Sequence, residues 1–437
     1  MTQQHLSQIE NGKRPLSIDQ RRLIVRELSI APEDLGLAPG ALRPLARGDS
    51  GPETMTSQLT WRNERRWLNQ HRSELARFAI SLYGADLHVP RSPLIAPSAW
   101  QLAEPIELGS VSLVLDENPQ TVGVDGSEQE SEPVRPLRTA RKRFDRYTAA
   151  VRHLDPPTLF ESRPSYRFLA GDPGEGLTFG MAAYFDKLDV SEAVGHELAA
   201  AAMNLGTIPV DPAAVAGRLP FRDRIGDPFD PTRRAIIPAI TTLTIRLRRY
   251  PAEPSFLLHW RDPAKVATAA GIYDVVPAGE FQPSSVALWD RRVDFDLWRN
   301  VVREYSEELL GAPEHDGTRT RPIDYDAWPL YQELQQARAD GAAVAAVLGM
   351  GLDALTLAAT ILTVVVLDDD VFDQAFGDAV RYNEEGEIVT VGGGVPADGV
   401  PFTEESVRRM LDQEPMASPG AACLSLAWQH RHWLLGL

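Results

Sequence analysis

The chain has 437 residues, and its 61 acidic and 44 Lys and Arg residues give a formal net charge of −17. This length indicates two or three domains, and 43% hydrophobic with 24% charged residues is typical of a soluble globular protein. The acidic excess excludes a protein that coats nucleic acid through bulk positive charge, although a local basic patch remains compatible with DNA binding. The single cysteine, Cys423, excludes an intramolecular disulfide and a multi-cysteine zinc site, so we expect a cytoplasmic protein.

The first fourteen residues predict a short helix followed by a turn. Thr2 is a good N-cap, and Gly12 suits the left-handed position at the helix end. Leu6 and Ile9 share one face, which leaves a polar flank beside them. Glutamine amides suit base reading because they both donate to and accept from adenine, and basic side chains meet phosphates. The residues expected at DNA on this basis are Gln3, Gln4, Ser7, Gln8, Lys13 and Arg14.

The runs Thr2-Gln3-Gln4 and Glu10-Asn11-Gly12-Lys13 resemble the recognition helix of the phage-repressor (XRE) family of helix-turn-helix regulators. Residues 17–28 and 31–37 resemble that family's fourth helix and the turn into its fifth. The resemblance implies that Gln3, Gln4 and Gln8 face base edges, and that Asn11, Lys13 and Arg14 face the DNA backbone. It also implies double-stranded DNA as partner and a homodimer, because such repressors read two half-sites about one helical turn apart.

The chain departs from that family by starting at the third helix, so we expect the native start roughly 25 to 35 residues upstream, the length of two helices and their turns. Two alternatives remain open. One is a truncated form that does not bind DNA, and the other is an amphipathic helix with glutamine-rich ends and no DNA role. A Pro-, Gly- and Ser-rich linker is expected over residues 38–60.

Residues 61–234 predict a mixed helical and β region. A helix is expected from Trp61, because apolar residues recur on one stripe with arginines between them. The basic run over residues 135–146 predicts a solvated face, with added phosphate contacts as the alternative. His196-Glu197 lacks a second histidine at Ala200, so these residues predict helix surface and no zinc site.

From residue 235 the pattern turns to strands and later helices. Residues 341–367 contain one charge, Asp353, and end in a β-branched run, which favours buried sheet over a membrane span. Asp368-Asp369-Asp370 predicts a solvated strand end, with a metal site as the alternative, and the apolar context of Cys423 predicts an inert thiol. The other strands are expected at 241–248, 256–260 and 273–281, and helices at 294–310, 327–339, from Glu404 after a Thr403 cap, and at 421–435.

Three glutamates crowd one flank of the helix expected at 294–310. Glu304 and Glu308 are four residues apart, and Glu307 is three from Glu304. Like charges at this spacing repel unless a cation or an arginine neutralises them, which suggests a divalent-metal site. The alternative is a solvated acidic face with Arg303 as internal counter-ion.

The run from Arg303 to Glu308 resembles the Arg-Glu-x-x-Glu-Glu core of the Nudix box, and residues 275–281 resemble the strand and Gly loop before that box. The resemblance implies Mg²⁺ held by Glu304, Glu307 and Glu308. The box places Gly and Glu where this chain has Trp289 and Phe295, so Gly279 and Glu280 serve only if residues 282–292 are an insertion.

The sequence therefore predicts an α+β multidomain chain: a partial helix-turn-helix domain (1–37), a linker (38–60), a mixed region (61–234) and a Nudix-like α/β/α sandwich with C-terminal helices (235–437). The expected function is a sequence-specific DNA-binding transcription regulator that requires no cofactor, with a domain that dimerises or senses a nucleotide-like ligand. The alternative is a metal-dependent Nudix-type hydrolase of nucleoside diphosphate derivatives.

Overall fold

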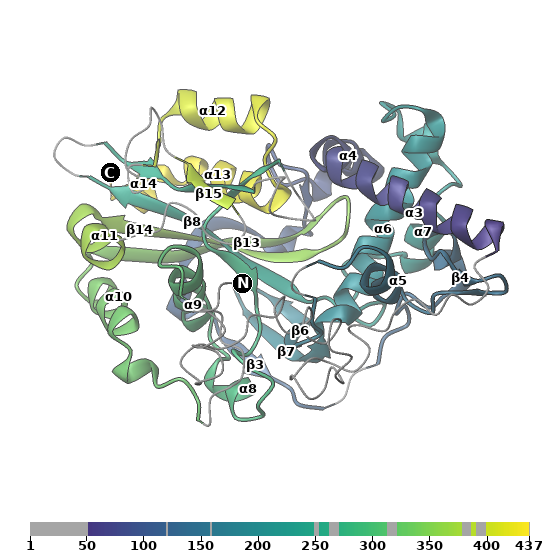
Figure 1. Ribbon diagram of the computed structural model, residues 1–437. Coiled ribbons are helices and arrows are strands. Elements are labelled where there is room, and N and C mark those ends of the chain that lie inside the picture. The colour runs from purple at the N-terminus through teal and green to yellow at the C-terminus, as the bar shows by residue number, and fades with distance from the viewer. Residues whose placement is uncertain are drawn as a thin grey trace, which may run out of the picture. The chain divides into compact units, whose positions relative to one another are not determined.

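The computed structural model describes residues 51–118, 121–157, 160–248, 253–261, 271–312, 321–377, 386–389 and 399–436. These residues form a mixed α+β structure around a curled half-barrel sheet (Figure 1). The chain divides into two compact units, residues 1–55 and 56–437. The expected helix-turn-helix segment, residues 1–37, and most of the expected linker lie outside the described residues.

The first described helix, α3 (Pro52–Gln70), begins at Pro52 rather than at Trp61. Proline is favoured at the first helical position, because its fixed φ suits the helix and its missing N–H has no intrahelical partner there. The helix therefore occupies the last part of the segment expected to be a linker. It is followed by α4 (Arg72–Ala79).

The main sheet of the described residues is centred on three long strands, β8 (Pro238–Leu247), β13 (Ala343–Asp353) and β14 (Ala359–Asp368). β13 and β14 form an antiparallel hairpin, and β14 runs parallel to β8 over its whole length. Nearly every residue of the three strands is buried, which explains the almost continuous apolar sequence of β13 and β14; the buried threonines of β8 bond across to β14. The buried sheet expected over residues 341–367 is confirmed, and in the part of the chain that is described no helix is long and apolar enough to cross a membrane.

Shorter strands extend this sheet on both sides, in the order β1-β13-β14-β8-β9-β16, with β2 on β13 and β12 on β8. Because β1 and β2 pair with β13, residues on both sides of position 235 share one sheet. The bounds are β1 (Leu94–Ile95), β2 (Gln101–Glu107), β9 (Ser255–Phe256), β12 (Ala278–Glu280) and β16 (Val400–Pro401).

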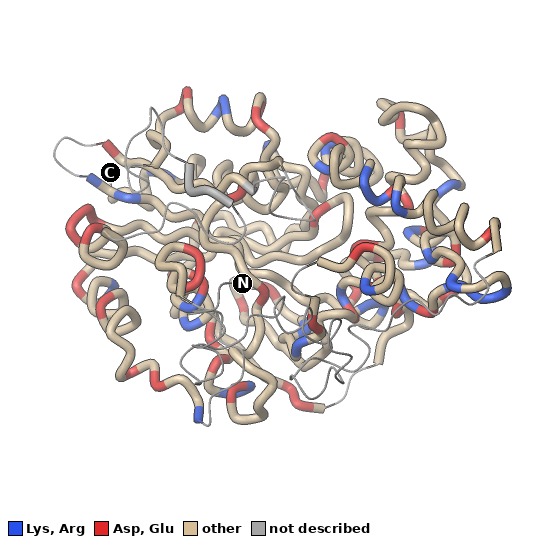
Figure 2. The backbone as a smooth tube through the Cα atoms, in the orientation of Figure 1, with Lys and Arg blue, Asp and Glu red and all other residues tan. Residues whose placement is uncertain are grey.

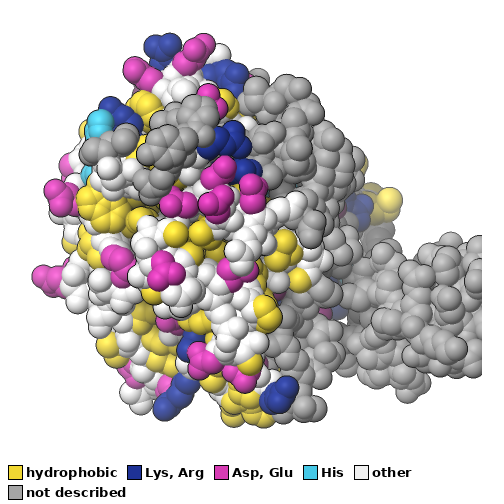
Figure 3. Space-filling model, turned by 90° about the vertical axis from the view of Figure 1, so that its left-hand side faces the viewer, with side chains coloured by type: hydrophobic (Ala, Val, Ile, Leu, Met, Phe, Trp, Pro, Cys, Tyr) yellow, Lys and Arg dark blue, Asp and Glu magenta, His cyan; other side chains and the backbone are white. Residues whose placement is uncertain are grey.

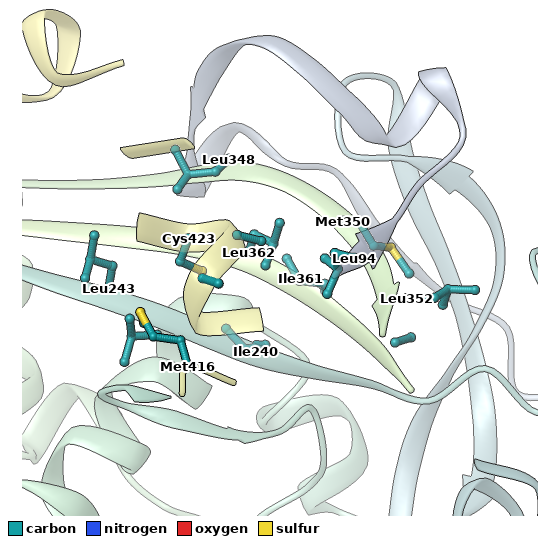
Figure 4. Packing of buried hydrophobic residues seen from close by; sticks show 14 of the residues in the cluster. Leu94, Ile240, Leu243, Leu348, Met350, Leu352, Ile361, Leu362, Met416 and Cys423 are labelled. Carbon is teal, nitrogen blue, oxygen red and sulfur yellow. The ribbon is translucent and has the colours of Figure 1, made fainter. Parts of the chain in front are cut away.

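Helices cover both faces of the long strands (Figure 1). On one face, the Thr244 hydroxyl of β8 bonds Tyr305 of α9, and Arg246 of β8 pairs with Asp369 of α11. On the other face Cys423 of α13 lies 3.3 Å from the carbonyl oxygen of Thr241, within the apolar cluster of Figure 4. The bounds are α9 (Leu297–Glu308), α10 (Pro329–Ala339), α11 (Asp369–Phe376), α12 (Glu404–Gln413), α13 (Ser418–Gln429) and α14 (Arg431–Leu435).

The middle part of the chain packs around the long helix α6 (Tyr184–Leu205). This part contains a three-stranded sheet in the order β3-β7-β6, and an isolated β-bridge between Phe168 and Ile236 joins that sheet to the start of β8. The elements here are β3 (Leu113–Leu115), β4 (Leu137–Thr139), β5 (Lys142–Arg143), α5 (Tyr147–Leu154), β6 (Pro164–Asp172), β7 (Gly176–Ala183) and α7 (Pro220–Ile225). A third sheet has the order β11 (Tyr273–Val275), β10 (Leu258–Arg261), β15 (Gly386–Val389).

Two predictions for single elements are corrected in detail. The strand expected at 273–281 is two strands, β11 and β12, and the terminal helix expected at 421–435 is α13 followed by α14. The N-cap at Thr403 is confirmed, because its side chain accepts the Ser406 N–H at 3.3 Å.

The basic run over residues 135–146 is only partly a solvated face. Arg135 is buried and donates to the carbonyl oxygens of Phe144 and Asp145. Arg146 forms an ion pair with Asp125 at 2.6 Å. Figure 2 shows the remaining Lys and Arg residues of β4 and β5 at the same end of the structure as the arginines of α3.

Candidate functional site

The acidic helix α9 is held by one polar cap and one buried face. The Asp296 carboxylate caps its start by accepting the Arg299 N–H at 2.8 Å. Val301, Val302 and Tyr305 are buried, and the Tyr305 hydroxyl bonds the Thr244 hydroxyl of β8 at 2.7 Å. This buried face fixes the rotation of the helix about its axis, so the flank with the glutamates is turned toward β12.

Gly279 of β12 lies directly beneath the carboxyl group of Glu304. A Cβ atom at position 279 would lie 2.1 Å from Glu304 Cδ, far inside van der Waals contact. Only glycine therefore allows the Glu304 carboxyl group to occupy this position. One residue earlier, the Ala278 N–H donates to Glu308 Oε1 at 2.8 Å. The structure thus brings Glu304 and Glu308 to the Gly-containing strand.

Glu307 is half-buried on the same helix. Among the described residues no group of three or more His, Cys, Asp and Glu side chains is arranged to hold a metal ion. The Mg²⁺ site at Glu304, Glu307 and Glu308 stays a prediction, and one oxygen of Glu308 accepts from the backbone of β12.

Arg303 points away from the glutamates into a buried polar cluster. Its Nη1 lies 3.2 Å from Asp294 Oδ2, and its Nη2 donates to the Gln282 carbonyl oxygen at 2.7 Å. Asp294, fully buried, also accepts from the Tyr325 hydroxyl at 2.7 Å. Burial disfavours the charge of Arg303, but Tyr325, Asp294 and Glu304 together raise its pKa above the usual value.

This cluster fastens the segment between Gly279 and α9. The Ser284 N–H donates to Asp294 at 2.7 Å, and the Ser285 hydroxyl bonds Asp290 at the start of the short helix α8 (Asp290–Val293). The expectation that Arg303 is the counter-ion of the glutamates is therefore incomplete, because its closest carboxylate is Asp294.

Glu280 is neutralised from another part of the chain. Its carboxylate forms an ion pair with Lys187 of α6, and both side chains are largely buried, with 18% and 8% exposed. The second oxygen, Oε2, is buried without a hydrogen-bond partner. A buried pair of this kind depends on both members, because removing one leaves an uncompensated charge. Lys187 therefore connects α6 to the strand beneath the acidic helix.

α6 is connected in turn to α3. His196, fully buried, lies 2.9 Å from the Tyr147 hydroxyl and 3.0 Å from Glu64 of α3. Glu192 forms ion pairs with Arg65 and Arg72. Polar contacts thus run from β12 through Lys187 and α6 to α3.

The prediction that His196 and Glu197 lie on a helix surface was wrong. The Glu197 carboxylate accepts the N–H groups of Phe221 and Arg222 at 2.7 and 2.9 Å, at the start of α7, and burial raises its pKa to about 7. Helix α6 is surrounded, so it has no solvated face at these positions. A signal for this burial was the run of small residues from Ala199 to Ala202, which permits close packing.

Two further sequence expectations are settled by the structure. Asp369 is not merely a solvated strand end, because it pairs with Arg246 and Arg248. Cys423 is fully buried, as expected, and burial raises the pKa of its thiol well above the usual range. The expected DNA-contacting residues, Gln3, Gln4, Ser7, Gln8, Asn11, Lys13 and Arg14, lie outside the described residues.

No protein-family model matches this chain, and no curated protein sequence matches it at a significant level.

Proposed function

We propose that the chain is a sequence-specific DNA-binding transcription regulator. Residues 1–37 read double-stranded DNA, and the domain of residues 235–437, Nudix-like in the proposal, dimerises or senses a nucleotide-like ligand. The DNA-reading role rests on the glutamine-rich motif at residues 2–14, and the sensing role rests on the contacts of the acidic helix.

A regulator is favoured because the residues that resemble the Nudix box bond other parts of the fold. Glu308 accepts from Ala278, Arg303 pairs with Asp294, and Glu280 pairs with Lys187. These groups join three elements, α9, β12 and α6, instead of converging on one point. In the proposal, a ligand that changes the position of α9 acts on α6 through β12.

The same contacts extend to α3, the first described helix, which follows the proposed DNA-reading segment in the chain. Glu192 and His196 of α6 hold Arg65 and Glu64 of α3, the helix that begins at Pro52. In the proposal, a ligand at α9 shifts Lys187, and α6 passes the shift to α3. The ligand binds one arrangement of these helices more tightly than another, and the difference between the two binding free energies sets how much the DNA affinity changes.

The test of the DNA-binding role is selection of duplexes from a random-sequence pool by the 437-residue chain. The expected result is enrichment of one sequence with two related half-sites, and binding that weakens steeply as salt rises. Substituting Lys13 and Arg14 with alanine should weaken binding to all sequences and flatten the salt dependence. A pool that shows no enrichment after repeated rounds would contradict the proposal.

A hydrolase remains the second candidate, and it is favoured by the position of Glu304 over Gly279 and of Glu308 beside it. It is tested by incubating the chain with nucleoside diphosphate derivatives and Mg²⁺. Turnover that Glu308→Gln abolishes and Glu405→Gln, at an exposed position of α12, leaves unchanged would establish the hydrolase. The regulator proposal expects no turnover above the level of the Glu308→Gln variant.

A further inference from the structure

A cavity of about 460 Å³ lies between the segment after α4, the segment before α7, and the turn that joins β13 to β14. Its walls include the apolar side chains of Leu82, Val215 and Leu357. None of its described lining residues belongs to α9 or β12, so it is separate from the acidic helix. Cavities of about 300–1,000 Å³ with mostly apolar walls are typical of small-molecule sites.

The wall of this cavity contains a buried arginine with neutral partners. Arg222 is 8% exposed, and its guanidinium donates to the Tyr83 hydroxyl and to the carbonyl oxygens of Ala354 and Leu355. Its Nε is buried without an acceptor. Arg222 is the sole cation among the described lining residues, and the nearest described carboxylate, Glu197, accepts its backbone N–H and has a pKa raised by burial to about 7.

A second buried arginine lies behind the same wall. Arg234 is 1% exposed and donates to the carbonyl oxygens of Pro228 and Leu357, two residues that line the cavity. Its Nε is also buried without an acceptor, and burial lowers the pKa of Arg234 to about 10. Leu357 has a φ of 61°, a left-handed conformation that is strained for a leucine and is held here by Arg234.

Two guanidinium groups are thus removed from water beside one cavity, and their described acceptors are neutral oxygens. Burying a charge without an opposite charge is costly, because neutral hydrogen bonds replace only part of its hydration. Polar and apolar groups contribute nearly equally to the surface of the cavity, and its only cation among the described lining residues is Arg222. Asp223, at an exposed position of the lining, is the one opposing charge among the lining residues described, and water screens it.

We propose that this cavity, the Arg222 cavity, binds a small organic anion whose carboxylate lies toward Arg222 and whose apolar body lies against Leu82, Val215 and Leu357. The site goes beyond the function proposed above, because it is separate from α9 and binding there does not require DNA. In a regulator, the bound anion would be an effector.

The test uses the 437-residue chain and two probes of the same length, sodium octanoate and 1-octanol, in titration calorimetry without DNA. Octanoate is expected to bind saturably with one site per chain, and octanol about ten- to a hundredfold more weakly, because a charge-assisted hydrogen bond adds about 1.5–3 kcal/mol. Asp223→Asn is expected to strengthen octanoate binding by removing the opposing charge.

The decisive variant is Ala216→Trp, which fills the cavity from an exposed position of its lining, with Ala149→Trp on the exposed face of α5 as matched control. Ala216→Trp should abolish octanoate binding, and Ala149→Trp should leave it unchanged. Arg222→Gln should weaken octanoate binding without changing that of octanol. The proposal is overturned if octanoate gives no saturable signal, if octanol binds as tightly, or if both tryptophan variants bind alike.

Discussion

The absence of a side chain at Gly279 leaves room for the carboxyl group of Glu304. A Cβ atom there would meet three atoms of the Glu304 carboxyl group at 2.1 to 2.3 Å. These atoms are the far end of a flexible, half-buried side chain that can turn aside, so Gly279→Ala is expected to displace the Glu304 carboxyl group and to lower the free energy of unfolding by less than about 1 kcal/mol. Urea denaturation measures the loss.

The double variant Gly279→Ala with Glu304→Ala separates this clash from other effects of the glycine. Because the second substitution removes the atoms that the new Cβ meets, Gly279→Ala should cost less in the Glu304→Ala background than in the unsubstituted chain. Additive losses would show that the strain at position 279 does not come from Glu304.

Glu197 gives a pH-dependent contribution to stability. Its pKa of about 7 in the folded chain lies above the usual 4.5, because burial disfavours the carboxylate. Between these values the folded state holds more of the proton than the unfolded state, so the free energy of unfolding falls as pH rises, by at most about 1.4 kcal/mol per pH unit for this group. Asp189, with a pKa of about 6, acts in the same direction.

Glu197→Gln should flatten the decline between about pH 4.5 and 7, although it lowers stability overall because one of two backbone N–H groups loses its acceptor. Urea denaturation across this range is the measurement, with Glu405→Gln on the exposed side of α12 as control. An unchanged slope in Glu197→Gln would mean that Glu197 does not hold a proton in the folded chain near neutral pH.

At the scale of elements, the ion pair between Lys187 and Glu280 joins α6 to β12. Lys187→Met is expected to cost about 3–5 kcal/mol of unfolding free energy, because it leaves the Glu280 carboxylate buried without its counter-ion. Replacing both residues with methionine should recover most of that loss.

The matched control for this pair is the exposed pair of Arg91 and Asp412, whose side chains are 43% and 51% exposed. Arg91→Met should cost less than about 1 kcal/mol, because water screens an exposed pair. If Lys187→Met costs no more than Arg91→Met, α6 and β12 are not joined by this pair.

The elements that the sequence predicted well are those whose burial follows a local pattern. β13 and β14 are nearly continuous apolar runs, β8 alternates apolar and polar residues, and α12 begins with a threonine cap. His196 and Glu197 were missed because their partners are Tyr147, Glu64 and the start of α7, all far away in the chain. The periodicity of apolar residues predicts which face of a helix is apolar, but it does not predict polar contacts with residues far away in the chain.

The candidate site was predicted only in part, because the spacing of residues along the chain determines some of its contacts and the packing of distant elements determines the others. Glu304 and Glu308 share a helix flank because of their spacing alone, and the structure places that flank on β12. The pairing of Arg303 with Asp294 and of Glu280 with Lys187 depends on how α8, α9 and α6 pack, which their spacing does not determine.

For the whole molecule, the net charge of −17 limits how the chain meets DNA. Acidic side chains are spread over much of the face seen in Figure 3. Because this face repels phosphates, we expect DNA contacts to come from the basic and glutamine-rich segment at residues 2–14. Binding without sequence preference should therefore be weak at physiological salt.

The most direct test of the regulator compares the affinity of the 437-residue chain for its selected duplex with that for a scrambled duplex at one salt concentration. Gln3→Ala with Gln4→Ala should reduce this ratio about tenfold or more, because each good base contact is worth about 1–3 kcal/mol. Gln413→Ala, at an exposed position of α12, should leave the ratio unchanged. A ratio near one for the unsubstituted chain, or one that the Gln3 and Gln4 substitutions do not lower, would contradict the proposed regulator.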